Sequence, residues 1–115
     1  MQHRFISPKV HGALDYLLDA SLLAIPFLFG FTGAAMWLCF GVGAANIGYS
    51  VLTSYRAGVV PLLPFRAHLV IDFVLGAAFV AAPFVLRFEG LAQVVYVLIG
   101  VGIMAIVAVT DPNTE

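Results

Sequence analysis

The sequence predicts an all-α fold: an integral membrane four-helix bundle built from two tandem parallel helical-hairpin repeats with pseudo-twofold symmetry. Composition is the first reason, because the chain of 115 residues is 63% hydrophobic and only 10% charged, whereas soluble domains carry about 25% charged residues. The second reason is that four apolar segments are each near the ~20 residues that a helix needs to cross a membrane. The third is an internal repeat, in which His11 and Asp15 return as His68 and Asp72, an offset of 57 residues (68 − 11).

The predicted spans follow one another with two short joins and one longer connection. They cover residues 8–31, 33–54, 65–87 and 90–110. The joins before Gly33 and Gly90 are tight, so the first two spans form one hairpin and the last two form another. The connection that contains Pro61 and Pro64 is the linker between them. We expect a single transmembrane domain over residues 1–115, with repeat 1 at about 8–54 and repeat 2 at about 65–110.

The repeat predicts one shared site. Each repeat contains two spans, so both repeats enter the membrane in the same direction and are related by an axis along the membrane normal. His11 and His68 then lie at one depth near the ends of their spans. Asp15 and Asp72 lie one turn deeper on the same helix faces, because positions i and i+4 are neighbours on a helix. If both faces point at the axis, two imidazoles and two carboxylates converge.

Three interpretations of this convergence stay open. The groups can be structural, with hydrogen bonds that set the register of the helices. Two imidazoles and two carboxylates also suit a divalent metal ion such as zinc, iron or manganese. Finally, His11 and His68 are candidate axial ligands of haem b, since histidines on facing helices of a bundle can hold an iron porphyrin. The structural interpretation and a bound metal or cofactor stand about even, because intramembrane ionisable residues are usually functional.

Asp19 and Asn46 break the repeat, because their counterparts are Gly76 and Ile103. Both belong to the first hairpin and fall at similar depth, counted from the ends of their spans at about 1.5 Å per residue. We predict that they form a polar intramembrane pair joined by a hydrogen bond, with Asp19 either protonated or facing a water-filled cavity. The alternative makes Asp15, Asp19 and Asn46 steps in a proton or cation path.

Charge predicts the orientation and excludes some partners. Arg4, Lys9, Arg56 and Arg66 lie on one side of the predicted spans and Arg87 on the other. The positive-inside rule therefore predicts that both termini are cytoplasmic, in the inner membrane of a bacterium. A net charge of −1 without a basic stripe argues against nucleic acid. The single cysteine, Cys39, excludes a disulfide framework.

Short motifs in both halves resemble a known family. Asp72-x-x-x-Gly76 leads to Ala82-Pro83-Phe84, and Asp15-x-x-x-Asp19 leads to Ile25-Pro26-Phe27. These two-span units resemble the SPW-repeat family of small membrane proteins, with Ile25 and Ala82 in place of Ser and Phe27 and Phe84 in place of Trp. The resemblance implies the two-hairpin fold. It implies no activity, and the histidines lie outside the signature.

The predicted function follows from the small extramembrane mass, which leaves little room for an enzyme site acting on soluble substrates. We expect a non-enzymatic membrane protein, a homo-oligomer or an accessory subunit of a larger membrane complex. Its candidate metal- or haem-binding residues are His11, Asp15, His68 and Asp72. The alternative is an oligomeric small transporter or channel for protons or cations that uses Asp15, Asp19 and Asn46.

Overall fold

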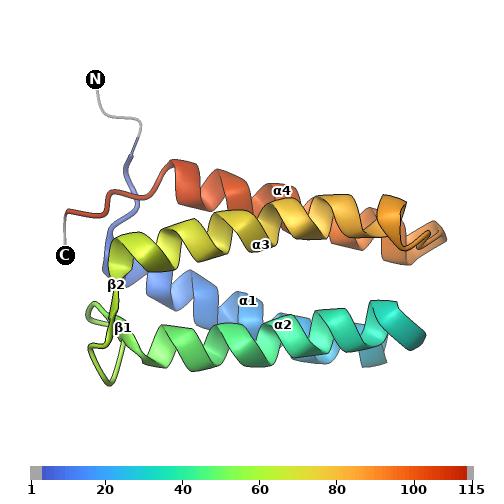
Figure 1. Ribbon diagram of the computed structural model, residues 1–115, viewed down its shortest axis with the longest axis horizontal. Helices are drawn as coiled ribbons and strands as arrows, with labels where there is room; N and C mark the ends of the chain where they lie inside the picture. The colour runs from blue at the N-terminus through green and yellow to red at the C-terminus, as the bar shows by residue number, and fades with distance from the viewer. Residues whose placement is uncertain (1–3, 114–115) are drawn as a thin grey trace.

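Four long helices lie side by side in the computed structural model, which describes residues 4–113 (Figure 1). They are α1 (Pro8–Leu28), α2 (Gly33–Val51), α3 (Phe65–Val85) and α4 (Gly90–Ala108). Two short strands in the α2–α3 connection, β1 (Thr53–Ser54) and β2 (Leu63–Pro64), pair in parallel. All four helices are long and apolar enough to cross a membrane. The predicted class, an all-α membrane four-helix bundle, is confirmed, while the pseudo-twofold symmetry stays a prediction.

The helices begin where the sequence predicted and end earlier, because the chain already turns inside the predicted spans. After α1, Gly30 adopts a left-handed conformation with φ 70°. Arg87 takes the same conformation after α3, with φ 61°, at a cost of roughly 1–2 kcal/mol for a residue that carries a Cβ. In each turn an amide then donates back to a proline carbonyl, Phe31 to Pro26 and Phe88 to Pro83, both at 2.8 Å.

Each hairpin packs through close contact between its own two helices. A Cβ added at Gly43 of α2 would meet the Asp19 carbonyl oxygen of α1 at 3.0 Å, and one at Gly100 of α4 would meet the Gly76 carbonyl oxygen of α3 at 2.5 Å. Small residues at such crossings let membrane helices approach closely. The bundle is thus two tightly packed hairpins, α1 with α2 and α3 with α4.

The hairpins also meet at the turn end, which we define as the end with the α1–α2 and α3–α4 turns. Tyr96 of α4 is fully buried there and donates its hydroxyl hydrogen to the Ala35 carbonyl of α2 at 2.6 Å. Its ring stacks on Phe79 of α3, with centroids 4.6 Å apart. Large apolar side chains such as Leu17, Trp37 and Leu98 are exposed on the outside of the bundle. Such a surface suits a lipid bilayer.

The terminal end carries the α2–α3 connection, the segment before α1 and the segment after α4 (Figure 1). Two similar backbone pairings close it. Thr53 pairs in parallel with Leu63, and Ile6 pairs in parallel with Thr110. Thr110 follows Thr53 by 57 positions (110 − 53) and Leu63 follows Ile6 by the same interval (63 − 6). The segment before α1 therefore pairs with the residues after α4 in the same way as the linker pairs with the residues after α2. Both threonines are held over the terminal end of the bundle.

Candidate metal centre

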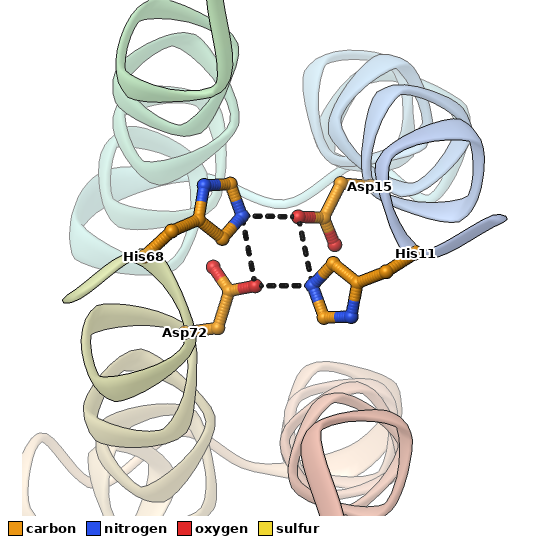
Figure 2. A group of neighbouring side chains, drawn as sticks. All are labelled: His11, Asp15, His68 and Asp72. Atoms are coloured by element: carbon orange, nitrogen blue, oxygen red, sulfur yellow. Dashed lines mark hydrogen bonds and ion pairs between the residues drawn. The ribbon is translucent and has the colours of Figure 1, made fainter. Parts of the chain in front are cut away.

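Four ionisable side chains meet between α1 and α3 near the terminal end, and we call them the His/Asp cluster: His11, Asp15, His68 and Asp72 (Figure 2). His11 and Asp15 lie one turn apart on α1, and His68 and Asp72 lie one turn apart on α3. All four are buried, with both histidines at 0% exposure and Asp15 the most accessible at 7%. The predicted convergence of these four residues is therefore present in the fold.

The closest contacts in the cluster run between the two hairpins. His11 Nε2 lies 2.8 Å from Asp72 Oδ2, and His68 Nε2 lies 2.7 Å from Asp15 Oδ2. Contacts within one helix are longer, at 3.2 Å for both His11–Asp15 and His68–Asp72. Figure 2 shows the resulting ring, in which imidazole nitrogens and carboxylate oxygens alternate. One ligand atom from each residue lies within 4.8 Å of all the others.

The other ring nitrogen of each histidine contacts a threonine hydroxyl. His11 Nδ1 lies 2.9 Å from Thr110 Oγ1, and His68 Nδ1 lies 2.8 Å from Thr53 Oγ1. Each threonine donates its hydroxyl hydrogen to a backbone carbonyl four positions earlier, at 2.6 Å. Because a hydroxyl has one hydrogen, Oγ1 must accept from the imidazole. Both histidines therefore carry a proton on Nδ1 and direct Nε2 at the carboxylates.

This tautomer limits what the cluster can contain. A bare Nε2 lone pair and a carboxylate oxygen repel each other at the 2.7–2.8 Å observed between the hairpins, so something positive must lie between them. Either two protons or one divalent cation supplies the charge that balances two carboxylates. In the first case the cluster is a ring of charge-assisted hydrogen bonds. In the second it is a metal site whose imidazoles are oriented through Nδ1, as in known metal sites.

The geometry fits a small ion better than haem. A tetrahedral ion with bonds of about 2.0–2.1 Å separates its ligand atoms by about 3.3 Å. The four separations between nitrogen and oxygen atoms are slightly shorter, at 2.7–3.2 Å, and the remaining pairs of ligand atoms lie within 4.8 Å. Haem would need its flat macrocycle between the two Nε2 atoms, where the Asp15 and Asp72 oxygens lie. The arrangement of the four ligand atoms therefore suits a small divalent ion better than haem.

Aromatic residues enclose the cluster and make it asymmetric. The Tyr49 hydroxyl of α2 donates to Asp72 Oδ1, whereas Ile106 occupies the position 57 residues further on (106 − 49) and offers Asp15 no such bond. Phe65 packs edge-on against His11, with centroids 5.4 Å apart. Tyr55, in the connection, stacks on Phe65 at 5.1 Å. Burial raises the pKa of Tyr55, so its phenol stays protonated beside His68, with ring centroids 5.4 Å apart.

The sequence interpretation missed three residues of this site. Thr53 and Thr110 carry a detectable signal, because they share the 57-residue offset, but they lie just past the ends of α2 and α4, outside the segments that carry the His-x-x-x-Asp motif. Tyr49 carries no such signal, since its counterpart is Ile106. A hydroxyl that pairs with a carboxylate of the other hairpin can be found only in three dimensions.

Asp19 and Asn46 are buried beside each other in the first hairpin, at 0% and 4% exposure. The Asn46 side chain faces the Asp19 carboxyl group. However, within residues 4–113 neither carboxyl oxygen of Asp19 nor Oδ1 of Asn46 has a partner at hydrogen-bond geometry. The two side chains therefore face each other as predicted, and the direct hydrogen bond between them stays a prediction. Close backbone packing at Gly43 sets the register of α1 and α2, and this register places the two side chains side by side.

Together, the fold and the cluster define a four-span membrane protein with a buried centre of two histidines and two aspartates. The chain belongs to the SPW repeat family: the model of the SPW repeat domain matches residues 9–110. The match covers both hairpins, which confirms the resemblance found in the sequence. No curated protein and no solved structure shows a significant match.

Proposed function

We propose that this protein is a non-enzymatic integral membrane protein that binds one divalent transition-metal ion, preferentially zinc, through the His/Asp cluster. The observation that carries the proposal is that four ligand atoms lie within 4.8 Å of one another, while both Nδ1 atoms are engaged by threonines. Two imidazoles and two carboxylates balance the charge of a divalent ion. Zinc accepts nitrogen and oxygen ligands in tetrahedral geometry, which this donor set supports.

The role that best suits this ion is structural. Zinc sites that perform chemistry keep an open coordination position, whereas structural sites are closed by four protein ligands. Here four buried protein residues supply the whole set. Two of them come from the first hairpin and two from the second, so a bound ion would cross-link the hairpins at the terminal end. A closed, buried site supports the expectation that the protein is not an enzyme.

Location and partners belong to the same proposal. Arg4, Lys9, Arg56 and Arg66 lie at or near the terminal end, and Arg87 lies in the turn after α3. The positive-inside rule then makes the terminal end, with the metal centre, cytoplasmic. The exposed apolar faces of the helices suit lipid and also a partner helix. We propose a homo-oligomer or an accessory subunit of a larger complex in a bacterial inner membrane.

Transport of protons or cations through Asp15, Asp19 and Asn46 is the second function predicted from the sequence. The buried, unpartnered oxygens of Asp19 support it. A route across the bilayer also needs polar groups towards the turn end. Among the described residues there, Tyr96 already donates to Ala35, and Leu22, Cys39 and Phe79 form an apolar core. This apolar half of the bundle favours the metal-binding function over transport.

Metal analysis of the purified, untagged protein tests the proposal. We expect about one zinc per chain after incubation with zinc and desalting, and loss of that zinc in His11→Ala and His68→Ala. The matched control is His3→Ala, which removes the remaining histidine of the sequence; this variant should keep the metal. A second control is Asp19→Asn, which removes a buried carboxylate outside the cluster.

Two results would contradict the proposal. One is a wild-type protein that retains no stoichiometric metal. The other is zinc retained equally by both alanine variants while circular dichroism shows normal helix content. A Soret band in the absorbance spectrum of the wild-type protein would instead establish haem.

A further inference from the structure

The first hairpin contains a second group of buried polar side chains, which the metal centre does not use. Asp19 of α1 and Asn46 and Ser50 of α2 are exposed by 0%, 4% and 0%. In the part of the chain that the structure describes, both carboxyl oxygens of Asp19, Oδ1 of Asn46 and Oγ of Ser50 have no hydrogen-bond partner. Native proteins rarely leave buried polar atoms unpaired, so a group of such atoms indicates a site that binds a ligand.

These side chains share one interface. The Asn46 side chain faces Asp19, and the helix backbones are closest at Gly43, directly beside Asp19. Ser50 lies one turn from Asn46 on the same face of α2. Its hydroxyl differs from those of Ser21, Thr53 and Thr110, which all donate to the carbonyl four positions earlier. The Ser50 hydroxyl faces the hydroxyl of Tyr55, and neither has a partner at hydrogen-bond geometry, so the Ser50 oxygen can still bind a ligand.

The second hairpin shows that the fold does not require these polar residues. At the positions 57 residues further on, Gly76, Ile103 and Val107 replace Asp19, Asn46 and Ser50. There, a Cβ added at Gly76 would meet the Gly100 carbonyl at 3.0 Å and Ile103 at 3.1 Å. The same helix crossing is thus packed with apolar groups alone. The polar residues of the first hairpin need an explanation other than packing.

The unpaired atoms indicate the charge and type of the ligand. The unpaired atoms of Asp19 and Asn46 are all acceptor oxygens, so a ligand that binds them must be a hydrogen donor or a cation. An ionised carboxylate in the apolar interior is very unfavourable without a compensating positive charge. All the atoms are oxygens, the ligands that hard cations prefer. One carboxylate balances a single positive charge, whereas divalent hard cations are usually bound by several carboxylates.

We propose that Asp19, Asn46 and Ser50 form a binding site in the first hairpin for one monovalent hard cation of the sodium type. The site is separate from the His/Asp cluster in residues, in donor chemistry and in charge. The site and the metal centre can therefore be tested independently.

Ion dependence of the wild-type protein is the first test. Thermal unfolding of detergent-solubilised protein is compared in sodium chloride and choline chloride at equal ionic strength. The comparison is made with zinc-loaded and with chelator-treated protein, so that the outcome does not depend on the metal centre. We expect a saturable rise of Tm with sodium in both preparations, because a ligand that binds only the folded state stabilises it.

Direct sodium binding, followed by sodium-23 NMR, locates the site. Asp19→Asn should weaken binding roughly tenfold or more, since it removes a charged ligand, and Asn46→Ile should weaken it in the same direction. The matched control is Ser21→Ala, which removes a hydroxyl of α1 that already donates to Leu17 and should leave binding unchanged.

Three outcomes would overturn the proposal. The first is a wild-type Tm that is the same in sodium and choline. The second is sodium binding that Asp19→Asn leaves intact, which would place the ion elsewhere. The third is an infrared band of a protonated carboxylic acid that disappears in Asp19→Asn and does not respond to sodium, because the ligand would then be a proton.

Discussion

His11 Nδ1 is hydrogen-bonded to the hydroxyl of Thr110, a residue 99 positions away and just past the end of the last helix. His68 makes the same bond to Thr53, only 15 positions before it. Each histidine is thus oriented by the hairpin to which it does not belong. The nearest carboxylate of each histidine also belongs to the other hairpin, at 2.7–2.8 Å. The His/Asp cluster therefore holds the two hairpins together as well as forming a candidate ligand set.

Removing the threonine acceptors should weaken metal binding without removing a ligand. In Thr53→Val or Thr110→Val, the imidazole loses the hydroxyl that fixes its tautomer and orientation. Loss of such an outer partner typically reduces metal affinity about 10–100-fold. Competition between the protein and a chromophoric chelator measures the change, and Thr→Ser at the same positions should restore affinity. Equal affinity in the valine variants and wild type would show that the threonines do not support a metal ligand.

Zinc uptake should release protons and should weaken as the pH falls. Without metal the neutral cluster contains two protons between its nitrogens and oxygens, and a divalent ion replaces both. We therefore expect release of about two protons per ion, since metal ligands must be deprotonated. Acid then favours the proton-bound form and lowers zinc affinity. A pH-indicator dye in weakly buffered solution counts the protons, and release that persists in His11→Ala would contradict this exchange.

Tyr49→Phe should destabilise the folded protein, whether or not metal is bound. The substitution removes the hydroxyl that donates to Asp72 and leaves a buried carboxylate oxygen unpaired, at a cost of about 1–3 kcal/mol. Thermal unfolding in detergent measures the loss. Tyr16→Phe is the matched control, because the Tyr16 hydroxyl donates to the Ala57 carbonyl outside the cluster. A Tyr49→Phe variant no less stable than Tyr16→Phe would show that the bond to Asp72 contributes little.

Gly100→Ala should destabilise the second hairpin, while Gly102→Ala should not. A Cβ at Gly100 would lie 2.5 Å from the Gly76 carbonyl oxygen, whereas a Cβ at Gly102 has no neighbour within 4 Å. Overpacking of this kind typically costs about 1–3 kcal/mol. Both substitutions raise helix propensity equally, so the difference in Tm between the two variants isolates the packing effect. Equal Tm values would indicate that α3 and α4 can move apart without penalty.

Much of the fold and part of the site can be predicted from the sequence, because the signals are local. Hydrophobic length predicts the four spans, and the beginnings of the helices at Pro8, Gly33, Phe65 and Gly90 agree with it. The spacing of four places His11 above Asp15 and His68 above Asp72 on their helices. Helix ends are less predictable, since Gly30 and Arg87 turn the chain inside segments that are still apolar.

The pairing between the hairpins depends on the tertiary structure. Nothing in the His-x-x-x-Asp motif indicates that His11 lies closer to Asp72 than to Asp15, or that Tyr49 donates to Asp72. The alignment of Asp19 with Asn46 likewise depends on the tertiary structure, because depth in the membrane does not specify the direction of a side chain. Hydrophobicity and helical periodicity are properties of a single chain segment. Contacts between segments depend on how closely the helices approach, and Gly43, Gly76 and Gly100 set that distance only once the hairpins have packed.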